Sequence, residues 1–323
     1  MCVCLLLLIN SACREEKSNH QPIKTSPLSN LESYYKANLK KSFLYLDSIQ
    51  STESSQQNKE FYLLARKHFK LSEPILSYLD KENYKTLNSP NLLRIQEEDA
   101  TDIKVRNPIG FQVIEENLFS DFPKDKQIFI VSKQTSGRIK FIYHNTHIKL
   151  KEHNLLWLIR DAILRIATTG LSNFDSPVLG QSLKESTFVY QSISEIITLY
   201  KERFDNIEIY NDWLYEIQKA QNVLSEDFDE FDRFNFIQNH THKQLELWNK
   251  TVTDWQVNFP FSLATQNEFN SLFSNEMFNI NYFSDHNSDT IHLTEKIALG
   301  KQLFNDKKLS ANNTTACASC HLQ

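Results

Sequence analysis

Residues 155–166 read LLWLIRDAILRI, and the spacing of their apolar side chains decides the fold class. Five side chains recur at intervals of three or four residues and would share one face of a helix: Leu155, Ile159, Ala162, Ile163 and Ile166. Gly170 can end this helix after Thr169. Ser182 and Glu185 have the spacing of a capping box that opens the next helix. The stretch therefore predicts two successive helices.

The same helical period recurs on both sides of this stretch. It is carried by Phe61, Leu64, Leu71, Ile75 and Leu79, and by Leu245, Trp248, Val252, Trp255 and Phe259. Residues 127–150 have a strand-like composition around a Ser136-Gly137 break, so a β-hairpin is an alternative there. Helices are the first expectation, because nothing else in the sequence offers strands to pair with. The predicted fold class is all-α.

The composition supports a helical, aromatic-rich core and excludes some functions. Hydrophobic residues make up 40% of the 323 residues, with 22 Phe, 12 Tyr and only 5 Gly. The net charge is −5, which provides no basic face for nucleic acid, so we expect no nucleic-acid partner. Because no cysteine lies between Cys13 and Cys317, the folded part must be stabilised by packing.

The first thirteen residues, MCVCLLLLINSAC, place a short apolar run before small residues and Cys13. This pattern is typical of a bacterial lipoprotein signal that is cleaved before Cys13, which then carries the lipid. We therefore expect a signal peptide at 1–13, a polar tether at 14–30 and a periplasmic protein anchored to the membrane. The run is too short to span a bilayer, so a buried or disordered N-terminus is the alternative.

Residues 317–321, Cys-Ala-Ser-Cys-His, have the spacing of a c-type haem attachment site. Two thiols separated by two residues can each bond a vinyl group of one porphyrin, and the adjoining imidazole can then ligate the iron. We predict one covalent haem c on Cys317 and Cys320, with His321 as axial iron ligand. A redox dithiol or half of a zinc site would need a βαβ pattern or a second ligand pair nearby, and the sequence has neither.

The segment from Leu293 to His321 strongly resembles the N-terminal haem segment of bacterial di-haem cytochrome c peroxidases. The resemblance rests on Leu299-Gly300-Lys301, Leu303-Phe304, Asp306, Leu309-Ser310 and the haem motif. It implies that residues 291–323 begin a cytochrome c-like haem domain, which is incomplete in this chain. Thr294 would cap a short amphipathic helix whose Ile297 and Leu303-Phe304 side faces the porphyrin. Gly300 would permit close helix contact, and Ser310 with the Asn312-Asn313 turn would lead to the cysteines.

The family reduces hydrogen peroxide to water, so the resemblance implies peroxide as substrate and a c-type cytochrome or other electron donor as partner. It also implies two haems, whereas this sequence has one Cys-x-x-Cys-His motif. We therefore expect the chain to correspond to the first part of a longer cytochrome c peroxidase. Alone, it is expected to bind haem and to turn over poorly. The alternative is a non-enzymatic, membrane-tethered haem or electron-carrier protein.

Residues 31–284 resemble a second family, the imelysin-like proteins, which are exported helical bundles that include iron-uptake lipoproteins. The resemblance rests on 110–115, similar to a Gly-x-His-x-x-Glu motif, and on Ala65-Arg66, Glu73-Pro74 and Phe174-Asp175-Ser176-Pro177. Gln112, Glu115 and Glu116 would share a helix face, but Gln112 stands where that family has histidine. Because an amide is a poor ligand for a transition metal, we expect Glu115 to cap or hydrogen-bond within the bundle. Iron binding is the alternative.

Four other histidines and one methionine are possible ligands. His240 and His242 would point to different faces of a helix, whereas His144 and His147 could share one. We expect solvated surface side chains in both pairs. Met277 could be a sixth haem ligand, but packing is the first expectation. The polar stretch 285–290 is predicted to separate the helical region from the haem segment.

Overall fold

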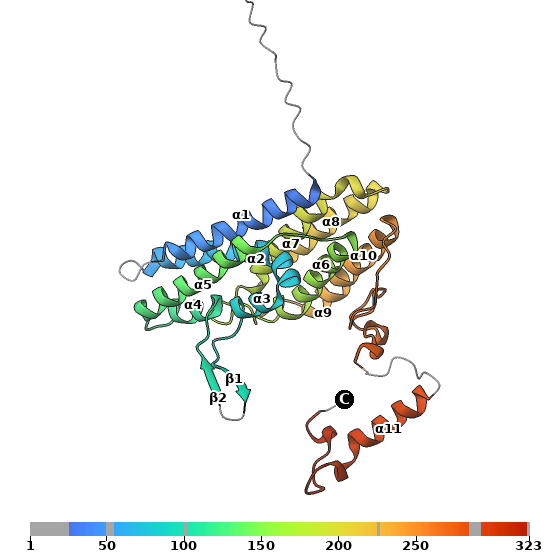
Figure 1. Ribbon diagram of the computed structural model, residues 1–323. Helices are drawn as coiled ribbons and strands as arrows, with labels where there is room; N and C mark the ends of the chain where they lie inside the picture. Colours follow the sequence, from blue (N-terminus) through green and yellow to red (C-terminus); the bar gives the residue numbers. More distant parts are fainter. Residues whose placement is uncertain (1–25, 50–54, 100–101, 225–226, 284–291, 322–323) are drawn as a thin grey trace, which may run out of the picture. The chain divides into compact units, whose positions relative to one another are not determined.

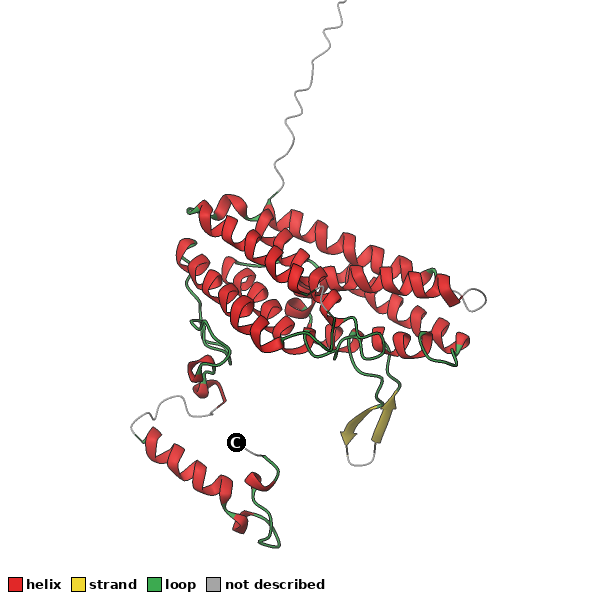
Figure 2. Cartoon of the chain, turned by 180° about the vertical axis from the view of Figure 1, so that it is seen from behind, coloured by secondary structure: helices red, strands yellow, loops and turns green. Residues whose placement is uncertain are grey.

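The computed structural model describes residues 26–49, 55–99, 102–224, 227–283 and 292–321. Helices dominate these residues, and one two-stranded hairpin is the only sheet among them (Figure 2). The predicted all-α class is confirmed. The chain divides into two compact units, Met1–Arg203 with Leu224–Asp229, and Phe204–Val223 with Glu230–Gln323. The predicted signal peptide, Cys13 and the polar stretch 285–290 lie outside the described residues.

The first unit is a helical bundle centred on α2 (Figure 1). Its helices are α1 (Pro27–Asp47), α2 (Ser55–Leu79), α3 (Lys81–Leu87), α4 (Phe111–Leu118), α5 (Asp125–Asn145), α6 (Glu152–Arg165) and α7 (Ser182–Leu199). Helix α2 packs against α1, α6 and α7, while α5 packs against α1. A 3-10 turn, η2 (Lys201–Arg203), follows α7. No helix among the described residues is both long and apolar enough to cross a bilayer.

Local sequence explains where α1 begins and which face it buries. Ser26 is its N-cap and accepts a hydrogen bond from the backbone of Ser29, and Pro27 follows at a position that needs no amide donor. Leu31, Tyr35 and Leu39 then recur every fourth residue and are fully buried. The helix starts inside the stretch predicted as a tether at 14–30.

The predicted apolar stripes are confirmed in α6 and only partly in α2. All five side chains of the 155–166 series are buried. In α2, however, Leu64 is 39% exposed, while the neighbouring Tyr62, Ala65 and Phe69 are buried. The reason is that α2 is covered on several sides, so its buried arc is wide and includes the charged residues Arg66 and Lys70. A search for apolar side chains alone does not detect such an arc.

The connection from α6 to α7 differs in detail from the prediction. Helix α6 continues as a π-helix, η1 (Ile166–Gly170), which ends at the predicted glycine. A side chain at Gly170 would meet the Ser186 hydroxyl at 2.5 Å, so glycine permits the close approach of α7. Helix α7 begins at Ser182 as expected, but the capping box is wrong. The Ser182 hydroxyl has no hydrogen-bond partner among the described residues, and Glu185 pairs with Arg66 instead.

A β-hairpin is present, but not where the sequence suggested one. The segment 127–145 belongs to the continuous helix α5, so the helical expectation there is confirmed. Strands β1 (Arg94–Asp99) and β2 (Asp102–Arg106) pair antiparallel, with Ile95 opposite Val105. Most of their residues are charged or polar, which hides the alternation that normally indicates a strand.

The second unit contains a smaller helical group and an extended C-terminal part. The helical group comprises α8 (Ile207–Val223), α9 (Arg233–Phe236), the π-helix η3 (Ile237–Thr241) and α10 (His242–Asp254). Leu245, Trp248 and Trp255 of the predicted stripe are buried, and Phe259 stacks on Trp248 at 5.5 Å. The later elements are η4 (Asn275–Met277), η5 (Ile280–Phe283), α11 (Leu293–Asn305), η6 (Lys307–Leu309) and η7 (Cys317–Ser319).

Candidate functional site

Helix α11 opens the haem-attachment segment, which we define as residues 292–321. Its hydrogen-bonding pattern starts earlier than predicted, because the Lys296 amide donates to the His292 carbonyl at 2.9 Å. His292 is therefore the N-cap, and Thr294 lies in the first turn instead of capping the helix. Gly300 has no neighbouring heavy atom within 4 Å of where a side chain would start. The close helix contact expected there is not present among the described residues.

The loop after α11 is held by its own short polar side chains. Asp306 accepts a hydrogen bond from the Lys308 amide at 2.9 Å and so caps the turn η6. The hydroxyl of Ser310 accepts from the Thr315 amide at 3.3 Å. Asn313 has a φ of 55°, a conformation that asparagine tolerates better than most residues. The structure thus has the predicted turn, which leads the chain towards the cysteines.

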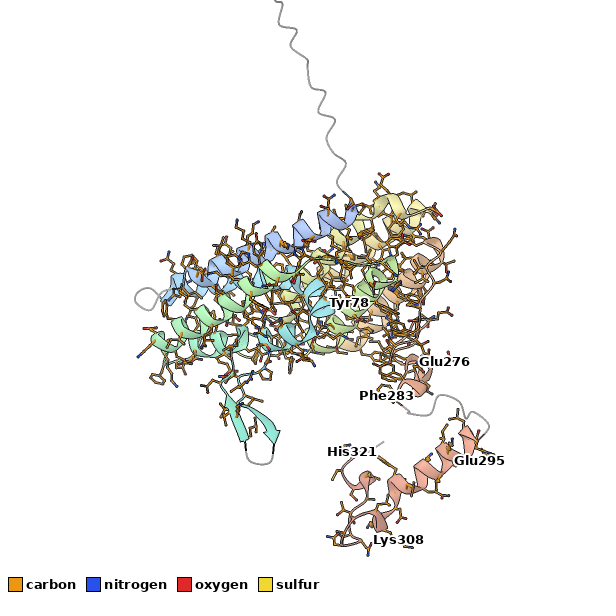
Figure 3. All side chains as sticks on the ribbon, in the orientation of Figure 1. Tyr78, Glu276, Phe283, Glu295, Lys308 and His321 are labelled. Atoms are coloured by element: carbon orange, nitrogen blue, oxygen red, sulfur yellow. The ribbon has the colours of Figure 1, made fainter. Side chains whose placement is uncertain are left out.

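The haem motif forms one tight turn with both thiols accessible. In η7 the amides of Cys320 and His321 donate to the Cys317 carbonyl at 3.2 and 3.0 Å. Ser319 closes the same turn, because its hydroxyl accepts from the Ala316 amide at 3.0 Å. Cys317 and Cys320 are free and exposed. Figure 3 labels His321, which is also exposed.

The residues of this segment fit a covalently attached haem. Two free thiols and an imidazole are the donor set that such a group requires. The macrocycle also needs an apolar surface, and four large apolar side chains of the segment are between 42% and 62% exposed: Ile297, Leu299, Leu303 and Leu309. Helix α11, which carries three of them, contacts η7. The thiols and the apolar surface therefore belong to adjoining elements.

The four histidines considered as ligands and Met277 have separate environments in the described part of the chain. His144 and His147 are exposed, as predicted. His240 contradicts the prediction of a surface side chain, because it is buried and its Nδ1 lies 2.7 Å from Oε1 of Glu216. It sits in the π-helix η3, and α8 supplies its carboxylate partner, which the sequence pattern did not reveal. His242 has a different environment, where its Nε2 accepts from the Leu272 amide at 3.1 Å. The Met277 backbone carbonyl accepts from the Gln266 amide in the extended part of the second unit.

Glu115 is hydrogen-bonded within the helical bundle, as the sequence predicted. Its Oε1 accepts from the Ser176 hydroxyl and from the amides of Val178 and Leu179, at 2.9–3.1 Å. Its Oε2 accepts from the Tyr62 hydroxyl at 2.9 Å, and Glu115 is fully buried. Gln112 is also buried and donates to the carbonyls of Asn88 and Phe174. Across the described part of the chain, no three His, Cys, Asp or Glu side chains are placed to hold a metal ion.

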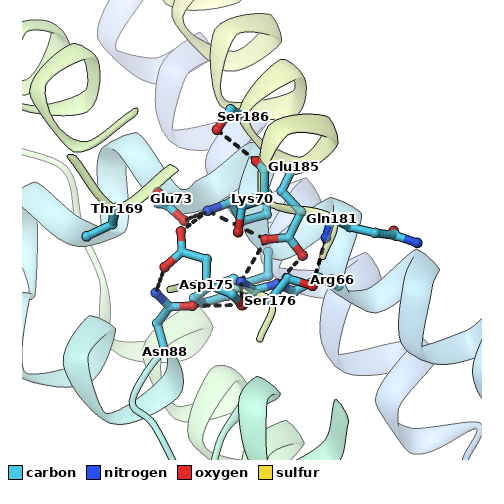
Figure 4. Close-up of polar contacts among 12 residues, drawn as sticks. Arg66, Lys70, Glu73, Asn88, Thr169, Asp175, Ser176, Gln181, Glu185 and Ser186 are labelled. Atoms are coloured by element: carbon cyan, nitrogen blue, oxygen red, sulfur yellow. Dashed lines mark hydrogen bonds and ion pairs between the residues drawn. The ribbon is translucent and has the colours of Figure 1, made fainter. Parts of the chain in front are cut away.

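A buried charge cluster lies in the first unit (Figure 4). We define it as Arg66, Lys70 and Glu73 of α2, Asn88 after α3, Asp175 of the connecting loop and Glu185 of α7. The Arg66 guanidinium donates twice to the Glu185 carboxylate at 2.8 Å. Lys70 Nζ lies 2.6 Å from Glu73 and 2.8 Å from Asp175. The cluster thus links α2 to α7 and to the loop between η1 and α7.

The charges of this cluster stabilise one another strongly enough to shift a pKa. Burial by itself would raise the pKa of Asp175, but Lys70 and Arg66, with hydrogen bonds from Lys70 and Asn88, lower it to about 2. Arg165 adds a third cation, with Nε 3.8 Å from the Glu73 carboxylate. The sequence contained one signal of this cluster, since Arg66, Lys70 and Glu73 recur at helical spacing. The pairing with Glu185 was not foreseen.

Comparison with known proteins supports one part of the chain. No curated protein matches it. One family model matches over residues 294–323, which include the whole haem motif and all of α11 except its first residue. That matched segment is similar to the family described as di-haem cytochrome c peroxidase.

Proposed function

We propose that this protein is an exported c-type haem protein whose residues 291–323 begin the first haem domain of a di-haem cytochrome c peroxidase-like protein. The observation that carries the proposal is the tight turn at 317–321, which presents two free, exposed thiols beside His321 within the matched segment. A bound haem would supply reversible one-electron chemistry and an iron atom at which peroxide can be reduced.

The residues of the segment have distinct roles in this proposal. Cys317 and Cys320 form the two thioether bonds, and His321 is the axial ligand of the single haem c in this chain. The hydrogen bonds to the Ser319 hydroxyl and to the Cys317 carbonyl hold the two cysteines in one turn before attachment. Ile297, Leu299 and Leu303 of α11 offer apolar side chains to the macrocycle. Peroxide reduction, with electrons from a c-type cytochrome or another donor, is proposed for the complete protein.

The rest of the chain has a tethering and docking role in the proposal. A signal peptide at 1–13 would direct export, Cys13 would carry a lipid, and the following polar residues would connect the anchor to an imelysin-like domain at 31–284 in the periplasm. The helical bundle of the first unit is consistent with a domain of this kind. Iron binding at 112–116 is disfavoured, because Gln112 and Glu115 are already hydrogen-bonded within the bundle.

The first test is the pyridine haemochrome spectrum of the chain co-expressed with a c-type haem maturation system. We expect a c-type band that persists after denaturation, weakens in Cys317→Ala or Cys320→Ala, and disappears in the double variant. His321→Ala should retain covalent haem but change the axial-ligand spectrum. Lys301→Gln, at an exposed position of α11, is the matched control, because it removes neither an attachment atom nor a hydrogen bond of the turn. Absence of covalent haem from the wild-type chain would contradict the proposal.

A second candidate function is electron transfer without peroxide chemistry. It is supported by the haem motif itself, because one haem attached at the turn 317–321 would be enough for one-electron transfer. Hydrogen peroxide turnover, assayed on the haem-loaded chain with a reduced c-type cytochrome, separates the two functions. Reversible oxidation and reduction without peroxide consumption would favour an electron carrier, whereas turnover that depends on His321 would favour a peroxidase.

A further inference from the structure

An aromatic surface in the second unit takes no part in the site described above. It belongs to the chain that follows α10, residues 260–283, which we call the aromatic strap. Four of its large side chains are between 55% and 70% exposed: Phe273, Phe278, Tyr282 and Phe283. Figure 3 labels Phe283 and Glu276 of the strap. Several exposed aromatic side chains in one short stretch indicate an interaction surface.

The strap carries these rings on a backbone that is already hydrogen-bonded. Within the strap, the Gln266 amide donates to the Met277 carbonyl at 2.8 Å. The strap is also attached to α10, because the Leu272 amide donates to Nε2 of His242 at 3.1 Å. A backbone that is satisfied in this way does not need to rearrange before its side chains make a contact. The exposed rings therefore belong to a formed loop that α10 holds.

The haem-attachment segment has a complementary surface. Four of its large apolar side chains are substantially exposed, as described above, and a bound haem would add an apolar macrocycle to them. The charges are complementary as well. The strap contains Glu268 and Glu276 and no lysine or arginine, whereas residues 292–321 contain four lysines against two carboxylates. Opposite net charges attract the two surfaces and select against wrong partners.

The two surfaces lie close to each other along the chain. The eight residues 284–291 separate Phe283 of the strap from His292 of the haem-attachment segment. A connection of this length, even fully extended, spans at most about 32 Å. Two surfaces joined by such a short connection meet at an effective concentration of the order of millimolar. A weak contact within one chain is therefore favoured over the same contact between two copies.

We infer that the aromatic strap docks on the haem-attachment segment of its own chain and covers the apolar surface of the haem. The covering of the haem rests on the proposed function, whereas docking on the apolar side chains of α11 does not. Aromatic rings bury a large area for few rotatable bonds, which suits them to this role. A less polar environment disfavours the more highly charged ferric haem, so the cover should raise the reduction potential.

The first test is amide hydrogen exchange of α11, measured by mass spectrometry on the full chain and on Tyr282→Ser/Phe283→Ser. Both side chains are more than half exposed, so the double variant should fold. We expect the α11 amides to exchange roughly fivefold faster in it, the change that the loss of one aromatic contact would produce. Phe122→Ser, at an 86% exposed ring in the first unit, is the matched control and should exchange like the wild type. Equal exchange in all three proteins would overturn the inference.

The second test is the reduction potential of the haem-loaded proteins, which should be lower in the double variant than in the wild type and in Phe122→Ser. An unchanged potential would overturn the covering of the haem. Protection of wild-type α11 that falls on dilution would place the strap on a second copy and would also overturn the inference. A wild-type chain without covalent haem would contradict the proposed function alone, because exchange of α11 in that chain still tests the docking of the strap.

Discussion

At the scale of single residues, Glu115 is a buried carboxylate whose two oxygens accept hydrogen bonds from other parts of the bundle. Glu115→Ala would leave two amides and two hydroxyls without their acceptor in a buried site. We expect the free energy of unfolding to fall by at least about 3 kcal/mol. Glu115→Gln should cost less, because an amide keeps one oxygen acceptor and the Tyr62 hydroxyl can turn to the Phe111 carbonyl. Urea denaturation of the full chain measures both effects.

A matched control separates this role from iron binding. Glu116 is the neighbouring carboxylate, only half-buried and hydrogen-bonded to Asn91, so Glu116→Ala should cost about 1 kcal/mol or less. Iron content, measured after equilibration with ferrous iron, should be the same for wild type and both alanine variants. Stoichiometric iron in the wild type that is lost only in Glu115→Ala would restore the iron-binding function.

At the scale of helices and strands, Gly110 provides the backbone conformation at which α4 begins. Its φ is 118°, a conformation that other residues rarely adopt, and a side chain there would meet the Leu87 carbonyl oxygen at 2.4 Å. Gly110→Ala should therefore destabilise the protein by more than about 2 kcal/mol. Gly137 lies inside helix α5 with open space around it, so Gly137→Ala should stabilise by about 0.5–1 kcal/mol. Equal effects of the two substitutions on thermal unfolding would contradict this account.

The buried charge cluster makes a second prediction at this scale. Arg66→Met or Glu185→Leu alone leaves a buried charge without its doubly hydrogen-bonded partner, and each should cost about 3–5 kcal/mol. The double variant should cost clearly less than the sum, with a coupling energy of about 1–3 kcal/mol. A double-mutant cycle by urea denaturation measures this coupling. The control cycle is Arg203 and Glu152, an exposed pair in the same unit, which should couple by less than about 1 kcal/mol.

How well the sequence predicts a helix and its buried face depends on which side chains that helix buries. Helix α6 buries mainly apolar side chains, with Arg160 as the charged exception, so the apolar spacing in the sequence identified both the helix and its buried face. Helix α2 also buries Arg66 and Lys70, which pair with Glu185 and Asp175 more than a hundred residues away in the chain. Local spacing cannot identify such partners. The haem motif was evident from the sequence, because thioether attachment fixes the spacing of the two cysteines and the adjoining histidine. The environment of His240 was not evident, because its carboxylate partner comes from α8.

At the scale of the whole molecule, the half-buried His68 and the buried Asp175 predict how stability depends on pH. Burial, with smaller contributions from Lys41 and Lys67, lowers the pKa of His68 to about 4. The unfolded chain then takes up a proton near its ordinary pKa of 6.5, while the folded chain does not. The free energy of unfolding must therefore fall as the pH falls from about 6.5 to about 4. Asp175, with its pKa lowered from 3.8 to about 2, adds a second loss as the pH falls between those two values.

Thermal unfolding of the full chain at a series of pH values between 8 and 2 measures both windows. His68→Gln should flatten the decline between about pH 6.5 and pH 4, because it removes the proton that the unfolded state binds. It should leave the lower window intact, since Asp175 belongs to the separate buried charge cluster. His147→Gln, at a largely exposed histidine, is the control and should follow the wild-type curve. If His68→Gln and the wild type decline in parallel, protonation of His68 does not control acid stability, and the loss must come from other groups.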